Sequence, residues 1–301
     1  MALLKNSAIF MMNYNEFNMS DLFKKTKVFA EGLDHPEGIA AHPDGSVWAG
    51  GEAGQVYRIS PEAKVNIMAD TGGFVLGLAF SPGSEWLALC DNGKKCVWKL
   101  DMRSMELEKY TEGIAGSGFM LPNYPVFDST GNLYVSDSGN FNEVNGRIFK
   151  IHSNGDSEIW HNGPFSFTNG MALDQKQEWL YVVSSWLPGV ERIRINADGS
   201  AGMKELFCTL PKTVPDGIAF DVDGNLYVTC YTPNVIYKVT PDRFTTAIVE
   251  DWESHTLSNP TNIAFGGKEL DQLFTANLGR WHITKIDIGV KGLPLVSHHK
   301  R

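Results

Sequence analysis

Four side chains with metal-binding chemistry occupy equivalent positions of a repeated phrase: Glu37, Asn123, Asn169 and Asp216. Carboxylate and amide oxygens are the ligands that hard divalent cations prefer. If these side chains meet, two carboxylates lie close together, and burying them without a counter-charge costs several kcal/mol. The pattern therefore predicts one divalent cation, with Ca²⁺ first and Mg²⁺, Mn²⁺ or Zn²⁺ as alternatives. Because neither histidine nor cysteine is among the four, a zinc site of the usual kind is disfavoured.

The elements that must position these side chains follow from the repeat, which occurs six times. Its equivalent positions are separated by 39, 47, 46, 47 and 45 residues. A period of about 45 residues is typical of the blades of a β-propeller. The six equivalent positions are Glu37, Leu76, Asn123, Asn169, Asp216 and Thr261.

The fifth copy shows that the local pattern is β. An apolar run at 218–220 meets a turn at 221–225 that contains Asp-Gly and Gly-Asn, and a second apolar run follows at 226–229. These turn residues supply the positive φ angles that a hairpin needs. Two further strands are expected at 234–240 and 245–251. Four antiparallel strands in each copy indicate a propeller blade.

The ends of the chain indicate how the ring closes. The sixth copy has three strands of its own, and the segment "TKVFAEG" at 26–32 precedes the first copy. We expect this N-terminal strand to complete the last blade, because closure removes exposed sheet edges. The predicted fold is all-β: a single six-bladed β-propeller over residues 26–301, preceded by an N-terminal extension over residues 1–25.

The propeller arrangement would gather the repeated positions in space. The first strand of each blade lines the central channel, so the six positions should form a ring at one of its mouths. The second strand runs back antiparallel, which brings its end to the same mouth. Those ends are Glu52, Asp91, Asp137, Ser185, Tyr231 and Asn277.

Composition excludes several partners. The 26 basic and 35 acidic residues give a net charge of −9, spread without long runs of one sign. This balance argues against binding to nucleic acid or to an anionic membrane surface. No stretch approaches 18 consecutive apolar residues, and the four cysteines lack metal or redox spacing, which favours reduced, buried thiols. We expect a cytoplasmic protein, a monomer or small homo-oligomer, that acts on a small molecule.

At the ring positions the chain resembles the senescence-marker-protein/gluconolactonase family, which includes regucalcin and is related to diisopropylfluorophosphatase. The resemblance covers most of the propeller and rests on "HPEG", "FTNG", "VPDG" and "LPN". It implies that Glu37, Asn169 and Asp216 bind the metal, and that Asn123 contacts the substrate or a metal-bound water. It also implies metal-dependent hydrolysis, commonly of sugar lactones.

Two departures from the family pattern concern the substrate. Lactonases of the regucalcin type carry an arginine two residues before the third-blade asparagine, where this chain has Leu121. The family motif usually continues Asn-Asp, but here Tyr124 follows Asn123. Both changes leave the metal ligands alone. They favour a less anionic, more apolar or aromatic substrate, contacted by Leu121, Asn123 and Tyr124.

Two further residues are candidates for substrate contact. Thr261 completes the ring in the sixth copy, and His282 lies in the phrase "NLGRWHIT" at 277–284. That phrase is expected at the rim of the mouth, where it either contacts substrate or is a loop packed by its tryptophan.

The expected reaction is hydrolysis of a lactone or other carboxylic ester. A divalent ion would act as Lewis acid, with Asp216 as general base and Asn123 orienting the substrate or a water. Direct attack by Asp216 is the alternative. Two other classes remain open: a propeller that binds calcium or a metabolite without catalysis, and a platform for protein interaction. Hydrolysis that a chelator abolishes and one ion restores would distinguish the enzyme from both.

Overall fold

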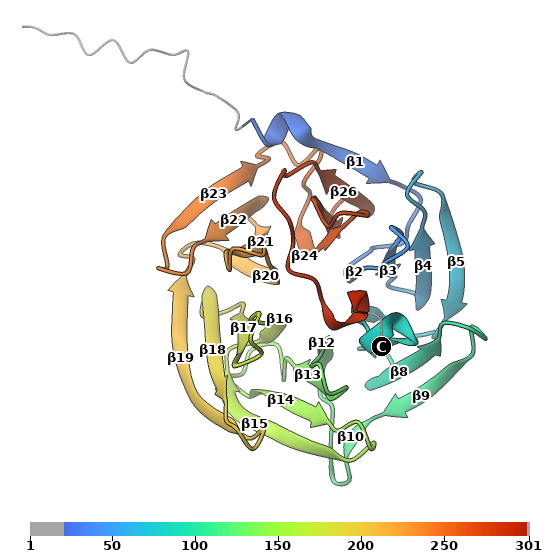
Figure 1. Ribbon diagram of the computed structural model, residues 1–301, viewed down its shortest axis with the longest axis vertical. Helices are drawn as coiled ribbons and strands as arrows, with labels where there is room; N and C mark the ends of the chain where they lie inside the picture. The colour runs from blue at the N-terminus through green and yellow to red at the C-terminus, as the bar shows by residue number, and fades with distance from the viewer. Residues whose placement is uncertain (1–20, 300–301) are drawn as a thin grey trace, which may run out of the picture.

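The structure, a computed structural model, describes residues 21–299. In this part of the chain the strands form six four-stranded antiparallel sheets arranged in a ring, together with one two-stranded sheet (Figure 1). The predicted all-β, six-bladed propeller is confirmed.

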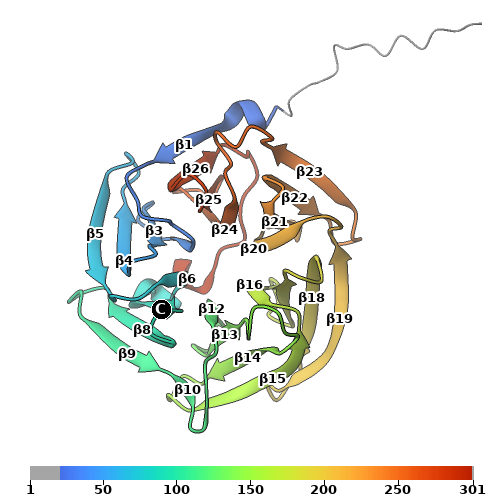
Figure 2. The ribbon, with the colours of Figure 1, turned by 180° about the vertical axis from the view of Figure 1, so that it is seen from behind.

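The first five blades each use four consecutive strands, the first beside the channel and the fourth at the outside (Figures 1 and 2). Blade one comprises β2 (Ile39–Ala41), β3 (Val47–Gly50), β4 (Gln55–Ile59) and β5 (Val65–Asp70). Blade two comprises β6 (Val75–Phe80), β7 (Trp86–Asp91), β8 (Cys96–Asp101) and β9 (Leu107–Thr111). The small sheet of β10 (Gly113–Ile114) and β11 (Ser117–Gly118) follows. Blade three comprises β12 (Pro122–Phe127), β13 (Leu133–Asp137), β14 (Gly146–Ile151) and β15 (Ser157–Phe165).

Blade four comprises β16 (Thr168–Leu173), β17 (Trp179–Ser184), β18 (Gly189–Ile195) and β19 (Ala201–Thr209). Blade five comprises β20 (Val214–Phe220), β21 (Leu226–Thr232), β22 (Val235–Val239) and β23 (Thr245–Glu250). Blade six takes β24 (Pro260–Gly266), β25 (Gln272–Asn277) and β26 (His282–Ile286) from the end of the chain. Its outer strand is β1 (Thr26–Ala30), which pairs antiparallel with β26. The N-terminal strand therefore closes the ring, as the sequence predicts.

A β-bulge lies at the start of each inner strand from blade two to blade six. In β20 the pairs Pro215–Cys230 and Ile218–Val228 leave Asp216 and Gly217 opposite a single residue. The same shift occurs in β6, β12, β16 and β24. A bulge re-aims a side chain out of the pleat, and each of these bulges contains one of the repeated positions.

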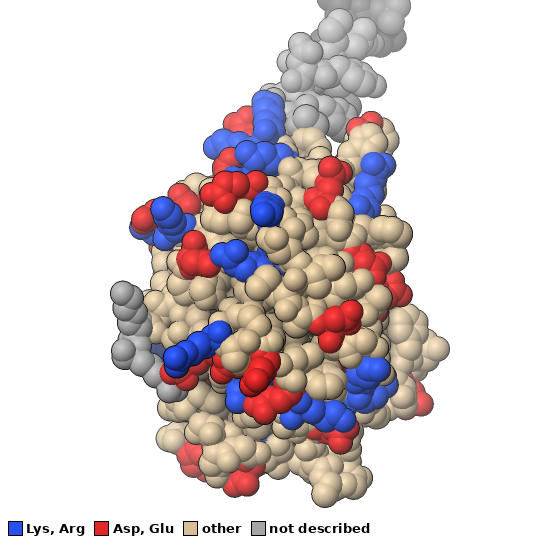
Figure 3. All heavy atoms as spheres, turned by 90° about the vertical axis from the view of Figure 1, so that its right-hand side faces the viewer, with Lys and Arg blue, Asp and Glu red and all other residues tan. Residues whose placement is uncertain are grey.

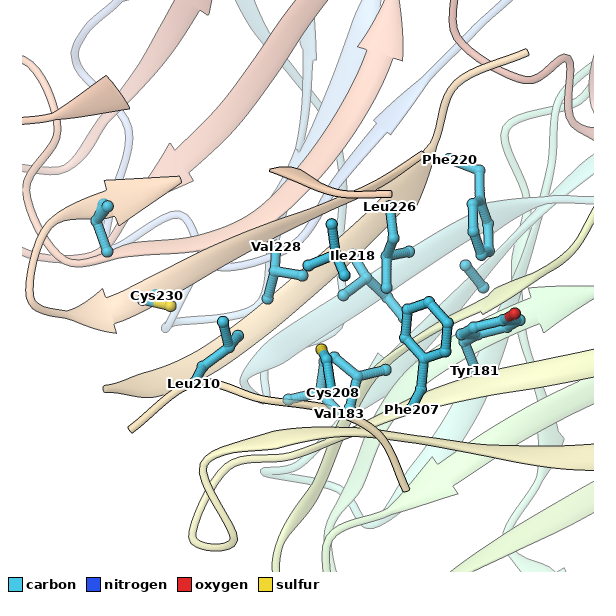
Figure 4. Packing of buried hydrophobic residues seen from close by; sticks show 14 residues of the cluster. Tyr181, Val183, Phe207, Cys208, Leu210, Ile218, Phe220, Leu226, Val228 and Cys230 are labelled. Carbon is cyan, nitrogen blue, oxygen red and sulfur yellow. The ribbon is translucent and has the colours of Figure 1, made fainter. Parts of the chain in front are cut away.

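Apolar side chains fill the spaces between neighbouring blades. The cluster in Figure 4 joins Tyr181 and Val183 of β17 to Ile218, Leu226 and Val228 of blade five. Fully burying one such aliphatic or aromatic side chain stabilises the fold by about 1.5–3 kcal/mol. Six clusters of this kind hold the described blades side by side, so the ring at the axis rests on a rigid frame.

The end of the chain lies across the channel at the mouth opposite the repeated positions. We call residues 287–299 the C-terminal tail; it includes a short 3₁₀ helix, η4 (Val296–His298). The tail is fixed to blade five by a hydrogen bond from Leu293 N to Phe220 O of 2.9 Å, and to blade two by one from Ser84 Oγ to Ser297 O of 3.1 Å. Figure 1 shows the tail crossing the centre of the ring.

Under this tail lies an apolar cavity of about 70 Å³. It is lined by the tail and by the distal halves of the inner strands, such as Ala41 of β2 and Leu173 of β16. The described channel is thus closed by apolar groups at one mouth, and the polar positions lie at the other.

The surface bears both signs of charge. On the side seen in Figure 3, acidic and basic side chains are interspersed. No helix in the described part of the chain is both long and apolar enough to span a membrane. The absence of nucleic-acid and membrane partners stays a prediction.

Candidate metal centre

Two carboxyl groups meet at the open mouth of the channel. Glu37 precedes β2, and Asp216 sits in the bulge of β20 with only 6% of its surface exposed. Burial, together with the charges of Asp216 and Glu52, raises the pKa of Glu37 to about 8. Burial raises the pKa of Asp216 to about 7, although hydrogen bonds from Asn169 and Asn262 oppose the shift. Both shifts reflect buried negative charge without a counter-ion, which a bound cation would supply.

Two amide side chains that hydrogen-bond to Asp216 have oxygens without a donor. Among the described residues only four buried side-chain nitrogen or oxygen atoms lack a hydrogen-bond partner, and two of them are Asn169 Oδ1 and Asn262 Oδ1. The amide nitrogens are engaged: Asn169 Nδ2 donates to Ser185 Oγ at 3.3 Å, and Asn262 Nδ2 donates to Asp216 Oδ1 at 3.3 Å. Buried acceptors normally find donors. Two orphaned oxygens beside two carboxylates form an acceptor-rich set that fits a hard cation.

Glycines bring the ring positions close together. A Cβ atom on Gly170 would lie 2.6 Å from the carbonyl oxygen of Asp216, and one on Gly217 would lie 2.6 Å from Asn262 Cα. A Cβ on Gly38 would lie 1.8 Å from the carbonyl oxygen of Leu76. A residue with a side chain would push the neighbouring blades apart at these points, so the glycine after Glu37, Asn169 and Asp216 is required by the ring itself.

Asn123 in blade three makes the same kind of hydrogen bond as Asn169 in blade four. It is buried, and its Nδ2 donates to Ser138 Oγ at 3.1 Å. Ser138 in turn donates to the carbonyl oxygen of Thr168, as Ser185 donates to that of Pro215. The serine therefore fixes the amide and ties the blade to the next one. Asn123 lies in the ring, as expected.

Other predicted contact residues have different surroundings. The Thr261 hydroxyl donates to the Glu37 carbonyl oxygen at 2.7 Å and ties blade six to blade one. Tyr124 stands where four of the other copies have glycine. It lines the apolar cavity, and burial raises its pKa to about 12. Leu121 is half-buried, and its backbone N–H donates to Asp137 at 2.6 Å. Direct substrate contact by these three stays a prediction.

His282 lies in a packed position. Only 2% of its surface is exposed, and its Nε2 hydrogen-bonds to the carbonyl oxygen of Thr256 at 2.9 Å. The imidazole of His282 therefore holds the loop between β23 and β24. The expected contact of His282 with substrate also remains a prediction.

The ends of the second strands mostly cap loops. Asp137 accepts hydrogen bonds from the backbone of Met120 and Leu121 and from Arg147. Asp91 accepts from Phe74 N at 2.9 Å. Both are fully buried, so they shape the connections that lead into the ring.

Sequence reasoning missed Asn262. The repeat aligned Thr261 with Asp216, which placed Asn262 at the position of Gly217. The bulge of β24 leaves both Thr261 and Asn262 opposite one residue, and it is the second whose side chain reaches Asp216. The signal was an amide in a position that is otherwise glycine in four of the six copies.

A second acidic group lies at the same mouth. His35 Nδ1 is 2.9 Å from both Asp34 Oδ1 and Glu52 Oε2, and its imidazole contacts the Trp281 ring at 4.0 Å between centroids, with the planes tilted by 49°. These three polar side chains are partly exposed. Glu52 also adds to the negative field around Glu37.

The sequence is similar to a family of known proteins that includes lactonases. Residues 100–277 match the family described as the SMP-30/gluconolactonase/LRE-like region, and residues 24–59 match the N-terminal part of strictosidine synthase-like proteins. Over 204 residues the chain is 24% identical to a gluconolactonase of Zymomonas mobilis, which covers 61% of this chain and 56% of that protein. Over 254 residues it is 21% identical to a pentonolactonase of Haloferax volcanii, 81% of each chain.

A solved structure has the same fold. The calcium-binding protein regucalcin of Agrobacterium tumefaciens superposes with a TM-score of 0.72 at 16% identity, over 88% of this chain and 97% of that one. The family match spans more than half of the residues, and it includes Asn123, Asn169 and Asp216. The chain belongs to the SMP-30/gluconolactonase/LRE-like family.

Proposed function

We propose that the protein is a metal-dependent lactonase. Glu37, Asn169 and Asp216 would hold one divalent cation, Ca²⁺ first, and Asn262 would add a fourth oxygen or orient Asp216. The observation that carries this proposal is the pair of orphaned amide oxygens beside two carboxyl groups with raised pKa values. The names of the lactonase relatives and of calcium-binding regucalcin support it.

The chemistry divides between the cation and the chain. When bound, the cation would polarise the lactone carbonyl and stabilise the charge that develops on its oxygen. Asp216 takes a proton from the water that adds to the acyl carbon. The ring C–O bond then breaks, and the proton passes to the departing oxygen, which yields a hydroxy acid. The hydrogen bond from Asn262 fixes the Asp216 carboxylate for this exchange.

Asn123 positions the reacting molecule. Its amide is fixed by Ser138 in a buried place on the ring, so it can hydrogen-bond a substrate oxygen or a water without a loss of side-chain freedom. Glu37 contributes charge to the cation.

A chelation experiment tests the proposal. The purified protein is stripped with EDTA and assayed on glucono-lactone, a pentono-lactone, unsubstituted γ- and δ-lactones and aryl acetates, then supplied with Ca²⁺, Mg²⁺, Mn²⁺ or Zn²⁺ in turn. We expect hydrolysis of at least one lactone that EDTA abolishes and one ion restores. A tightly bound ion without turnover would favour a calcium-binding propeller, and neither binding nor turnover would contradict the proposal.

A further inference from the structure

Three aromatic rings form a partly exposed cluster on blades three and four, which we call the aromatic rim: Phe141, Phe167 and Trp186. The ring centroids are 5.7 Å apart for Phe141 and Phe167, 5.1 Å for Phe141 and Trp186, and 5.2 Å for Phe167 and Trp186. Phe141 is 61% exposed and Trp186 is 38% exposed. Val144 and Leu187, on the same connections as Phe141 and Trp186, are exposed as well.

The rim is held in place by the backbone. Trp186 Nε1 donates to the Phe141 carbonyl oxygen at 3.0 Å, and Ser185 N donates to the Phe167 carbonyl oxygen at 3.1 Å. Phe167 has a φ of 64°, a left-handed conformation that is unfavourable for a bulky residue. Such strain persists only where the surroundings enforce it, and it gathers at ligand sites.

The rim is continuous with the metal centre. Phe167 is separated from Asn169 by one residue, and Trp186 directly follows Ser185, which holds the Asn169 amide. All three rings lie on connections at the open mouth: between β13 and β14, between β15 and β16, and between β17 and β18. A molecule bound at the metal centre could therefore extend a substituent over the three aromatic side chains.

The polar groups beside the rim offer little to an anionic substrate. Arg147 of β14 already donates to Asp137, to Ser117 Oγ and to the Gly118 carbonyl oxygen. Leu121, on the loop before β12, adds another apolar side chain. In contrast, aromatic side chains recognise flat or alkyl groups through edge and face contacts, and a contiguous exposed apolar patch is typical of a binding surface.

We propose that Phe141, Phe167 and Trp186 form a specificity subsite that takes an aromatic or alkyl substituent of the lactone. The preferred substrates are then lactones that carry an apolar group, rather than polyhydroxylated sugar lactones. This inference rests on the proposed lactonase function, because the metal centre must hold the reacting carbonyl group while the aromatic rim holds the substituent.

The test compares substrates that differ in one group: γ-butyrolactone, γ-phenyl-γ-butyrolactone and γ-octyl-γ-butyrolactone, with glucono-lactone alongside. The variants are Phe141→Ala, Trp186→Ala and the conservative Trp186→Phe. Phe244→Ala is the matched control, because Phe244 is 68% exposed in the hairpin between β22 and β23, at the opposite face.

We expect each alanine variant on the rim to raise KM for the phenyl and octyl lactones by roughly five- to tenfold, the usual range for one aromatic contact. The kcat values should stay within about twofold, because the lost contact is the same in the ground state and the transition state. The unsubstituted lactone and Phe244→Ala should show little change. Trp186→Phe keeps an aromatic ring but loses the hydrogen bond to the Phe141 carbonyl oxygen, so its KM should rise less than that of Trp186→Ala. Thermal unfolding midpoints confirm that the variants are folded.

Failure of the inference is distinguishable from failure of the proposed function. If chelator-sensitive hydrolysis occurs but the rim variants leave the preference for substituted lactones unchanged, the inference is wrong and the lactonase stands. If no lactone is hydrolysed, the proposed lactonase function is wrong. Quenching of tryptophan fluorescence by γ-phenyl-γ-butyrolactone then tests whether the aromatic rim binds an apolar substituent. Saturable quenching that Phe141→Ala weakens and Phe244→Ala does not supports the subsite; its absence overturns it.

Discussion

The two ends of β20 carry buried aspartates with opposite surroundings. Asp221, after the strand, accepts hydrogen bonds from Asp223 N, Asn225 N, Asn225 Nδ2 and the Tyr227 hydroxyl, at 2.8–3.1 Å. Asp216, in the bulge at the other end, has two amide donors and faces the carboxyl group of Glu37. Burial is similar, so the supply of donors is what differs. A carboxylate with four donors is satisfied within its own turn, whereas one with fewer donors that faces a second carboxyl group fits the proposed cation site.

The largest effect that tests this comparison is on turnover. Asp216→Asn should lower kcat for the best lactone by about 10²–10⁴-fold, since it removes the proposed general base. Asp221→Asn should leave kcat near that of the parent protein but lower the free energy of unfolding by about 1–3 kcal/mol, because it places an amide among donors. Steady-state kinetics and urea unfolding measure both. Equal losses of kcat in the two variants would contradict the distinction.

The next effect concerns the affinity for the cation. Glu37→Gln should weaken metal binding by more than about 100-fold, since even partners that only orient a ligand are worth about 10–100-fold. The metal-free variant should be at least as stable as the parent, because an uncompensated buried charge is gone. Calorimetric titration with Ca²⁺ and thermal unfolding in EDTA provide the measurements. Glu52→Gln, which removes a neighbouring charge outside the ring, is the control.

A smaller effect on metal affinity is expected at Asn262, which alignment of the repeats did not identify as part of the site. Asn262→Ala should weaken metal binding by about 10–100-fold, because it removes an unpartnered oxygen and the donor to Asp216. Asn225→Ala removes another buried amide, at the end of blade five opposite Asp216, and should lower stability without changing metal affinity. An unchanged affinity in Asn262→Ala would place this amide outside the metal site.

A further effect is a dependence of stability on pH. In the metal-free protein the pKa values of Asp216 and Glu37 are about 7 and 8, above their ordinary values. Between pH 5 and 8 the folded chain therefore binds more protons than the unfolded chain, so stability falls as pH rises. The slope is at most about 1.4 kcal/mol per pH unit for each proton.

A bound cation should remove this dependence, because it keeps both groups ionised. The increase in melting temperature on adding Ca²⁺ should thus be larger at pH 8 than at pH 6. Melting curves with EDTA or Ca²⁺ at the two pH values measure it, and an increase that is larger at pH 6 would be the opposite of this expectation.

The sequence was informative wherever the repeat applied. The spacing predicted six blades and the closing strand, because each copy alternates apolar runs with hairpin turns. It also placed Glu37, Asn169 and Asp216 in register. The role of Asn262 could not be predicted, since a bulge lets two consecutive residues face one partner and alignment by repeat counts only one. The hydrogen bond from the Thr261 hydroxyl to the Glu37 carbonyl oxygen has no sequence signature, and the expected contact of Thr261 with substrate stays a prediction.

Two other features lay outside the pattern. The aromatic rim comes from connections, whose lengths and residues differ between copies. The C-terminal tail follows the last repeat and has no periodicity that would reveal its path. Its position depends on a few hydrogen bonds: two backbone bonds to blade five, one backbone bond to the β24–β25 turn of blade six, and one from the Ser84 hydroxyl of blade two. Residues 1–20 of the expected N-terminal extension are outside the described residues.

The C-terminal tail covers one mouth of the central channel, so the channel resembles a cup whose floor is the tail. Leu293 and Val296 contribute to that floor, so traffic through the molecule from face to face is blocked. Under the proposed function, a lactone and the hydroxy acid formed from it would enter and leave by the same mouth, beside the aromatic rim. Accumulated product would then compete with fresh substrate for that passage.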